Sequence, residues 1–108
     1  MKTFLLPLSI AGCLLATAAD AQRVTIVHDA GDPQASYAAR RLGEALTGAG
    51  YTVRPERSGY DHLVSLALHP ERLEAEAFAI IPEGKVVTVY GGDDRGLIYG
   101  ALALAEEL

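Results

Sequence analysis

Apolar and polar residues alternate at the start of the globular part in a way that predicts a strand followed by a helix. Residues 23–28 alternate β-branched with polar side chains, which is typical of a strand. Asp32 is a candidate helix N-cap, and Pro33 suits the first helical position because its missing N–H is not needed there. The apolar stripe of this helix recurs at spacings of three and four: Ala35, Ala38, Ala39, Leu42, Ala45, Leu46 and Ala49.

Two further strands are predicted after this helix. Gly48 and Gly50 can end the helix in the left-handed conformation. Residues 51–54 then form a second strand, which completes a parallel β-α-β unit. The polar segment 55–62 is predicted as a loop, and the nearly continuous apolar run 63–68 is short enough for a buried strand.

The C-terminal part predicts a hairpin and a second helix. Residues 77–81 and 85–90 are expected to pair antiparallel through 82–84, a type I turn that closes with a bulge. A helix is expected from Arg95 to beyond Leu108, with no C-terminal cap in view, so we interpret the sequence as truncated in its last helix. The expected fold class is α+β, with a mixed sheet of four to five strands and two helices on one face.

The first residues have the pattern of a secretory signal peptide. Lys2 supplies the positive charge, 4–15 is almost wholly apolar, and a small-x-small pattern ends at Ala21. We therefore expect cleavage between Ala21 and Gln22, with residues 1–21 as the signal, residues 22–108 as one small domain, and a periplasmic or extracellular location. The apolar run is too short and too interrupted for a convincing membrane-spanning helix.

A second interpretation of the same segment is a lipoprotein signal. Residues 10–13 resemble a bacterial lipobox, in which Cys13 is lipidated and becomes the first mature residue. Only this alternative would place the protein at a membrane. The apolar run before the box is shorter than a usual signal core, which favours the soluble interpretation.

The charge balance excludes some classes of partner. The chain has 9 Lys and Arg against 14 Asp and Glu, a net charge of −5. Nucleic acids and anionic membrane surfaces attract clustered cations, so neither is an expected partner. Cys13 is the only cysteine, and its removal with the signal would leave no disulfide.

A family pattern lies in the last third of the sequence. Residues 76–80 follow the form E-x-F/Y-x-I, and Asp93, Gly96, Tyr99 and Gly100 follow D-x-x-G-x-x-Y-G at the start of a helix. This pattern resembles the small α/β domain that precedes the catalytic barrel in α-glucuronidases and bacterial β-N-acetylhexosaminidases. The resemblance implies a fold like the second domain of hexosaminidases over residues 23–108.

The same resemblance sets the expectations for chemistry. In these families the paired acids act from the barrel, so no catalytic residue, cofactor or metal is expected in this chain. Arg95 and the Gly91-Gly92 pair make it look nearer to the α-glucuronidases. A downstream catalytic domain of the same polypeptide is the expected partner, with an oligosaccharide or polysaccharide as the substrate of the parent enzyme.

The segment 91–96 resembles a phosphate loop only superficially. Asp93 and Asp94 lie where a phosphate would bind and would repel it, and the glycine spacing does not fit a dinucleotide site. An aspartate that caps the following helix is the better interpretation. The neighbouring acids in sequence, 74 with 76 and 106 with 107, show no facing partner of the kind that glycoside hydrolysis requires.

Gly96 and Gly100 are costly inside a helix and require a reason. Helical spacing predicts that they lie on the face away from the core. We therefore hypothesise that another stretch of backbone approaches there closely, either a strand of this domain or the catalytic domain.

The remaining polar and aromatic residues give weak signals. His28, His62 and His69 lack the spacing of zinc ligands, and no Gly-x-Ser-x-Gly elbow is present. Tyr60, in a loop, is the one aromatic residue worth testing against a sugar ring. The other candidates are expected to pack in the core: Tyr37, Tyr51 and Phe78.

The leading hypothesis is thus a non-catalytic N-terminal accessory domain of an exported carbohydrate-degrading glycoside hydrolase. The alternative is a stand-alone exported module that binds a polysaccharide or another partner.

Overall fold

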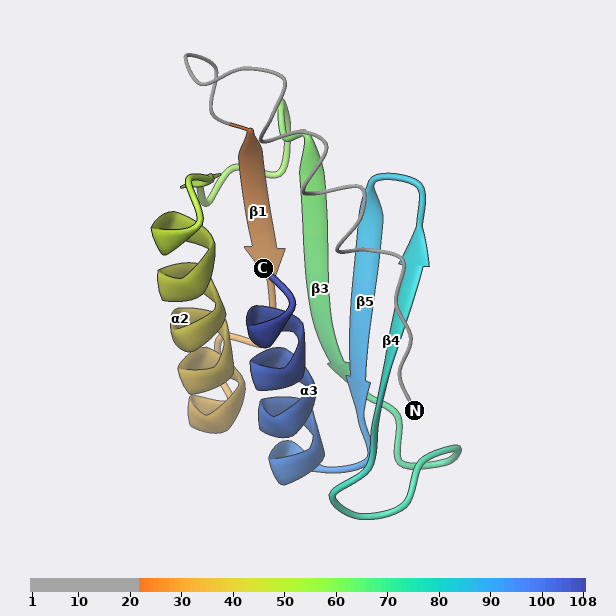
Figure 1. Ribbon diagram of the computed structural model, residues 1–108. Coiled ribbons are helices and arrows are strands. Elements are labelled where there is room, and N and C mark those ends of the chain that lie inside the picture. Colours follow the sequence, from red (N-terminus) through yellow and green to blue (C-terminus); the bar gives the residue numbers. More distant parts are fainter. Residues whose placement is uncertain (1–21) are drawn as a thin grey trace.

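The computed structural model describes residues 22–108 as one sheet covered on one face by two helices (Figure 1). The predicted signal cleavage site, between Ala21 and Gln22, lies at the edge of these residues, and Cys13 of the lipobox lies outside them. The elements in chain order are β1 Arg23–Val27, α2 Pro33–Gly48, β2 Thr52–Val53, β3 His62–Leu68, β4 Phe78–Glu83, β5 Val86–Gly91 and α3 Asp94–Glu106. Between residues 22 and 108, no helix is long and apolar enough to cross a membrane.

The β-α-β unit forms as the sequence predicts. Strand β1 pairs with β2 in parallel, and α2 connects them. Asp32 is the N-cap of α2, where its side chain accepts a hydrogen bond from the Gln34 N–H, and proline occupies the first turn. Gly50 has φ +100°, in the left-handed region that glycine tolerates. Gly48 instead belongs to α2 itself, so the prediction that it adopts this conformation was wrong.

The sheet has the strand order β2-β1-β3-β5-β4. Strand β3 lies at its centre and pairs in parallel with β1 and with β5, while β4 pairs antiparallel with β5. The mixed sheet predicted from the sequence is confirmed, with five strands. His62, predicted in the preceding loop, is the first residue of β3.

The hairpin differs from the prediction in its turn. Glu83 pairs with Val86, so the turn contains only Gly84 and Lys85, and Gly84 has φ +62°. Glycine at the first central position suits a two-residue type II′ turn, whose twist matches the strands. Pro82 therefore lies within β4, which is an edge strand of the sheet. The open side of an edge strand pairs with no other strand, so the N–H that proline lacks removes no sheet hydrogen bond there.

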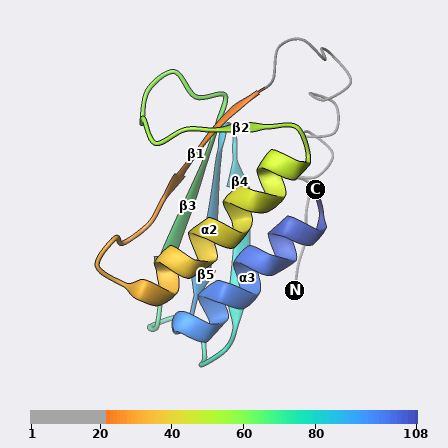
Figure 2. The same cartoon turned by 90° about the vertical axis from the view of Figure 1, so that its left-hand side faces the viewer.

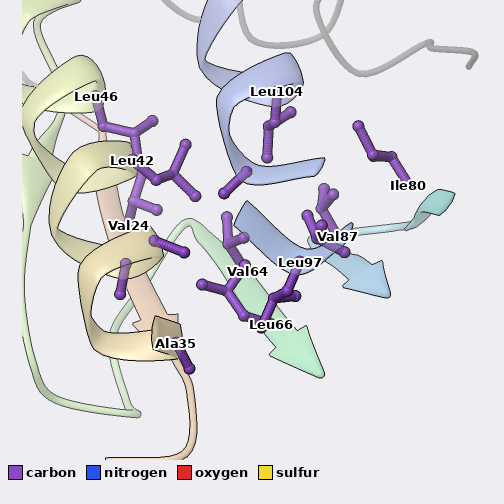
Figure 3. Packing of buried hydrophobic residues seen from close by; sticks show 14 of the residues in the cluster. Val24, Ala35, Leu42, Leu46, Val64, Leu66, Ile80, Val87, Leu97 and Leu104 are labelled. Carbon is purple, nitrogen blue, oxygen red and sulfur yellow. The ribbon is translucent and has the colours of Figure 1, made fainter. Parts of the chain in front are cut away.

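Both helices lie side by side on the same face of the sheet, and the core fills the space beneath them (Figures 2 and 3). The prediction of two helices on one face is confirmed. Helix α3 spans Asp94–Glu106, with Glu107 as its C-cap. The buried core consists of Val24, Ala35, Ala38, Ala39, Leu42, Leu46, Tyr51, Val64, Leu66, Ile80, Val87, Val89, Leu97, Ala101 and Leu104.

Candidate functional site at the start of helix α3

The two sequence segments that carry the family pattern contact each other at the start of α3. Asp93 is the N-cap of this helix, and its Oδ1 accepts hydrogen bonds from the Gly96 N–H at 2.9 Å and the Glu76 N–H at 3.0 Å. These two backbone donors lower the pKa of Asp93 below its ordinary value. The Gly92 N–H donates to the Ala77 carbonyl at 2.9 Å. One carboxylate thus joins the start of α3 to the segment that leads into β4.

Glu76 has an unusual conformation for its residue type. Its φ is +66°, in the left-handed region that residues other than glycine seldom adopt. The Asp93 hydrogen bond holds its N–H, and the Arg95 guanidinium lies 3.0 Å from its carboxylate. Both charged side chains of this pair are largely exposed, so the pair contributes little to stability by itself.

The glycines of the motif allow this close contact. A Cβ on Gly92 would lie 1.9 Å from the Glu74 carbonyl oxygen, and one on Gly96 would lie 2.1 Å from that of Ala77. A Cβ on Gly100 would lie 2.6 Å from Val89 Cγ1. None of these positions has room for a larger residue without movement of its neighbours.

Gly96 and Gly100 are therefore buried, and their predicted position on the face away from the core was wrong. The close approach inferred from them does exist. At Gly96 the approaching group is backbone before β4, and at Gly100 it is the side chains of Val89 and Phe78. Residues of this domain account for both glycines, the segment before β4 at Gly96 and strands β4 and β5 at Gly100.

A pair of carboxyl groups links the N-termini of the two helices. Asp94, the first residue of α3, is hydrogen-bonded through its side chain to Asp32, the N-cap of α2. This contact raises the pKa of Asp94, and it lowers the pKa of Asp32. Of the two carboxyl groups, Asp94 is therefore the one that binds a proton first as the pH falls. Its Oδ1 is shielded from solvent and accepts no hydrogen bond from the described residues.

The arrangement does not suit hydrolysis of a glycosidic bond. Two carboxyl groups within hydrogen-bond contact stand closer than the roughly 5–9.5 Å that a sugar and its attacking water require between them. A shallow polar pocket lies beside the pair, lined by Gln34, Glu76, Asp93, Asp94 and Arg95. Among residues 22–108 no three His, Cys, Asp or Glu side chains converge as metal ligands would.

The histidines and tyrosines lie apart from this site. His62 is half-buried in β3, and burial lowers its pKa, while the His69 ring lies against Tyr90 with centroids 5.4 Å apart. Tyr60 is half-buried in the loop before β3. His28, at the end of β1, has a buried Nδ1 with no hydrogen-bond partner among the described residues.

The predicted packing aromatics divide into two groups. Tyr51 is 3% exposed in the core, and Phe78 packs against the core, as predicted. Tyr37 does not belong to the core cluster. The guanidinium groups of Arg40 and Arg41 lie 5.4 and 5.9 Å from the centre of its ring, and its hydroxyl accepts a hydrogen bond from Arg41. The prediction of a core position for Tyr37 was wrong.

Comparison with known families identifies the family to which this fold belongs. The family described as glycosyl hydrolase family 20, domain 2, matches residues 15–107. The chain belongs to the glycosyl hydrolase family 20 domain 2 family. The description of the matching family does not mention α-glucuronidases, so the match gives no support to the preference for them. No curated protein sequence matches the chain.

Several solved structures are similar to this family 20 domain. A GH138 enzyme targeting pectin rhamnogalacturonan II matches with a TM-score of 0.66 and 27% identity over 80% of this chain and 13% of that one. The structure of CpGH84D matches with a TM-score of 0.59 and 16% identity, over 77% of this chain and 17% of that one. The chain thus spans less than a fifth of either solved chain, and the second match shows the shared fold alone.

The close contact at Gly96 generates a stability prediction. We expect Gly96→Ala to lower the free energy of unfolding by about 1–3 kcal/mol, because the Ala77 carbonyl must move to admit a Cβ. Gly48→Ala is the matched control, since no atom lies within 4 Å of its added Cβ. It should raise the free energy by roughly 0.5–1 kcal/mol through helix propensity. Urea unfolding of the two variants measures both, and equal effects would contradict the close contact.

The raised pKa of Asp94 generates a prediction about pH. The pKa of Asp94 is raised in the fold, so its contribution to stability is present at low pH and is lost as pH rises through that pKa. Asp94→Asn removes the like-charge repulsion with Asp32, and it should raise the urea midpoint at pH 7. The gain should shrink as the pH approaches 4. Glu83→Gln, which removes an exposed charge from β4, should show no such trend. A gain for Asp94→Asn that is independent of pH would contradict the raised pKa of Asp94.

Proposed function

We propose that residues 22–108 are a non-catalytic accessory domain of an exported, carbohydrate-degrading glycoside hydrolase whose catalytic barrel follows in the same polypeptide. The observation that carries this proposal is membership of a family that is by description a second domain of glycosyl hydrolases. The proposal includes removal of residues 1–21 after Ala21 and a periplasmic or extracellular location.

The chemistry of the described residues supports a non-catalytic role. Asp93 accepts two backbone hydrogen bonds, Glu76 pairs with Arg95, and the side chains of Asp32 and Asp94 contact each other between the helix N-termini. Each of these acids therefore has a structural partner. A glycosidase instead holds two carboxyl groups open on either side of a bound sugar.

The proposed substrate is an oligosaccharide or polysaccharide with hexosamine or hexuronic acid linkages. The hexosaminidase-type family favours the hexosamine. The similar GH138 enzyme, described as targeting a pectin, makes an acidic plant polysaccharide the other candidate for the parent enzyme.

The mass of the native gene product, with its first residue, tests the proposal. We expect a polypeptide that begins at Gln22 and continues for a barrel of about 250 residues or more beyond this domain. A mature protein of 108 residues or fewer would overturn the proposal and favour a stand-alone binding module. A diacylglyceryl mass on Cys13 would overturn the proposed cleavage after Ala21 and indicate a lipoprotein instead.

Activity measurements on the long product test the non-catalytic role. Asp32→Asn, Asp94→Asn and Glu74→Gln should leave glycosidase turnover close to that of the parent, because none of them would contact the sugar. Removal of a true general acid lowers turnover by about a hundredfold or more. A loss of that size, in a variant that melts like the parent, would place catalysis in this domain.

A further inference from the structure

The face of the sheet that the two helices leave uncovered is almost free of charge. Strands β3, β5 and β4 lie side by side (Figure 1), and alternation places three side chains of each on this face. We name these residues the open sheet face: Leu63, Ser65, Ala67, Val86, Thr88, Tyr90, Ala79, Ile81 and Glu83. All nine are at least partly exposed, and Glu83, beside the hairpin turn, is the one charged residue among them. Since a sheet face that meets water usually carries polar residues, this composition requires an explanation.

Tyr90 lies between two small neighbours on this face. In the register of the sheet it is opposite Ala67 of β3 on one side and Ala79 of β4 on the other. Cross-strand neighbours normally cover part of each other's side chains. A methyl group is too short to cover a tyrosine ring, so the apolar surface of this ring stays open to a ligand on both sides.

His69 extends the aromatic surface beyond the end of β3. Its N–H donates to the Gly91 carbonyl at 2.8 Å, which holds its backbone beside the end of β5. The His69 and Tyr90 rings have centroids 5.4 Å apart and planes inclined at 53°. The Glu71 carboxylate lies 3.3 Å from the His69 Nδ1 on the other side of this ring pair. The two rings thus form one aromatic surface at one end of the open sheet face.

Two hydroxyl groups lie next to this aromatic surface. Ser65 is opposite Thr88 in the sheet, and Thr88 precedes Tyr90 by two residues on the same strand. That spacing corresponds to about 7 Å along the strand. Neither hydroxyl forms a hydrogen bond with another of residues 22–108. Both are therefore available to a ligand that packs on the rings.

This combination matches the chemistry of a sugar. A pyranose ring has an apolar C–H face and a rim of hydroxyl groups, so an aromatic ring with hydroxyl groups beside it can bind both parts. Protein interfaces are enriched in Tyr, Trp, Phe, Met and Arg, and of these the open sheet face holds only Tyr90. The single charge on the face is negative, so an anionic sugar would meet no cation there.

We propose that the open sheet face binds an uncharged oligosaccharide, with a pyranose ring packed on Tyr90 and His69 and its hydroxyl groups bonded to Ser65 and Thr88. This inference goes beyond the proposed function, because it gives the domain a ligand of its own whether or not a catalytic barrel follows. In a parent hydrolase such a site would keep the polysaccharide close to the enzyme without taking part in cleavage.

Hydroxyl-radical footprinting of the long native product tests the site directly. The probe is a thio-linked tetrasaccharide of N-acetylglucosamine, whose sulfur bridges resist hydrolysis, and oxidation is read from the mass of each peptide. The oxidation of Tyr90 and His69 should be lost as the concentration of the probe rises. Tyr99 is the internal control, because it is 44% exposed on α3, on the opposite side of the domain. Its oxidation should not change.

Variants of the same product separate the aromatic platform from a general effect. Tyr90→Ala should raise the probe concentration that half-protects His69 by about tenfold, whereas Tyr90→Phe, which keeps the ring, should leave it near that of the parent. Ala67→Glu keeps the tyrosine but places a long charged side chain beside it, and it should weaken protection as Tyr90→Ala does. Tyr99→Ala is the matched control and should protect like the parent. Melting temperatures confirm that each variant is folded.

The outcomes distinguish this inference from the proposed function. Oxidation of Tyr90 that does not respond to the probe would overturn the sugar site and leave the proposed function intact. A Tyr90 that is unreactive before any probe is added would also overturn it, since another part of the polypeptide would then cover the face. Equal protection by a galacturonate tetrasaccharide would overturn the preference for an uncharged ligand. A native product without a following domain would overturn only the proposed function, and the same footprint could be measured on it.

Discussion

The Asp93 carboxylate is the interaction on which the rest of the fold's C-terminal half depends. One oxygen accepts the Gly96 N–H at the start of α3 and the Glu76 N–H before β4, two donors far apart in the sequence. Because β5 lies between these segments in the chain, the carboxylate closes the β4-β5-α3 unit on itself. A neutral side chain of the same shape could accept these bonds, but an anion accepts them more strongly.

The cap dictates how closely the helix approaches the sheet edge. Once Asp93 holds both amides, the backbone of α3 lies against the Ala77 carbonyl, and only glycine fits at positions 92 and 96. Gly100, one turn later, extends the same tight contact to Val89 and Phe78. The helix propensity lost at these glycines is offset by the burial of Leu97 and Leu104 beneath the helix.

The sequence predicts the order and type of the elements because its hydrophobic periodicity is strong. Contacts between residues far apart in the sequence produce no such local pattern, so they are harder to predict. Gly96 and Gly100 signal a close approach, but a helical wheel places them away from the core because glycine has no side chain to count as apolar. Pro82 suggests a turn, yet an edge strand tolerates it, and edge position depends on pairings that the local sequence does not show. The contact of Asp94 with Asp32 was missed for the same reason, since an acid at a helix start indicates only where its own helix begins.

That contact follows from the architecture rather than from chemistry on a substrate. Strands β1 and β5 run in the same direction as β3, and each is followed by a helix on the same face, so the N-termini of α2 and α3 come to the same end of the sheet. Each helix start favours an acid through its unpaired N–H groups and its dipole. Two such acids in contact repel unless a proton lies between them. The raised pKa of Asp94 therefore follows from the placement of acids at two helix starts that lie together, and it needs no catalytic role to explain it.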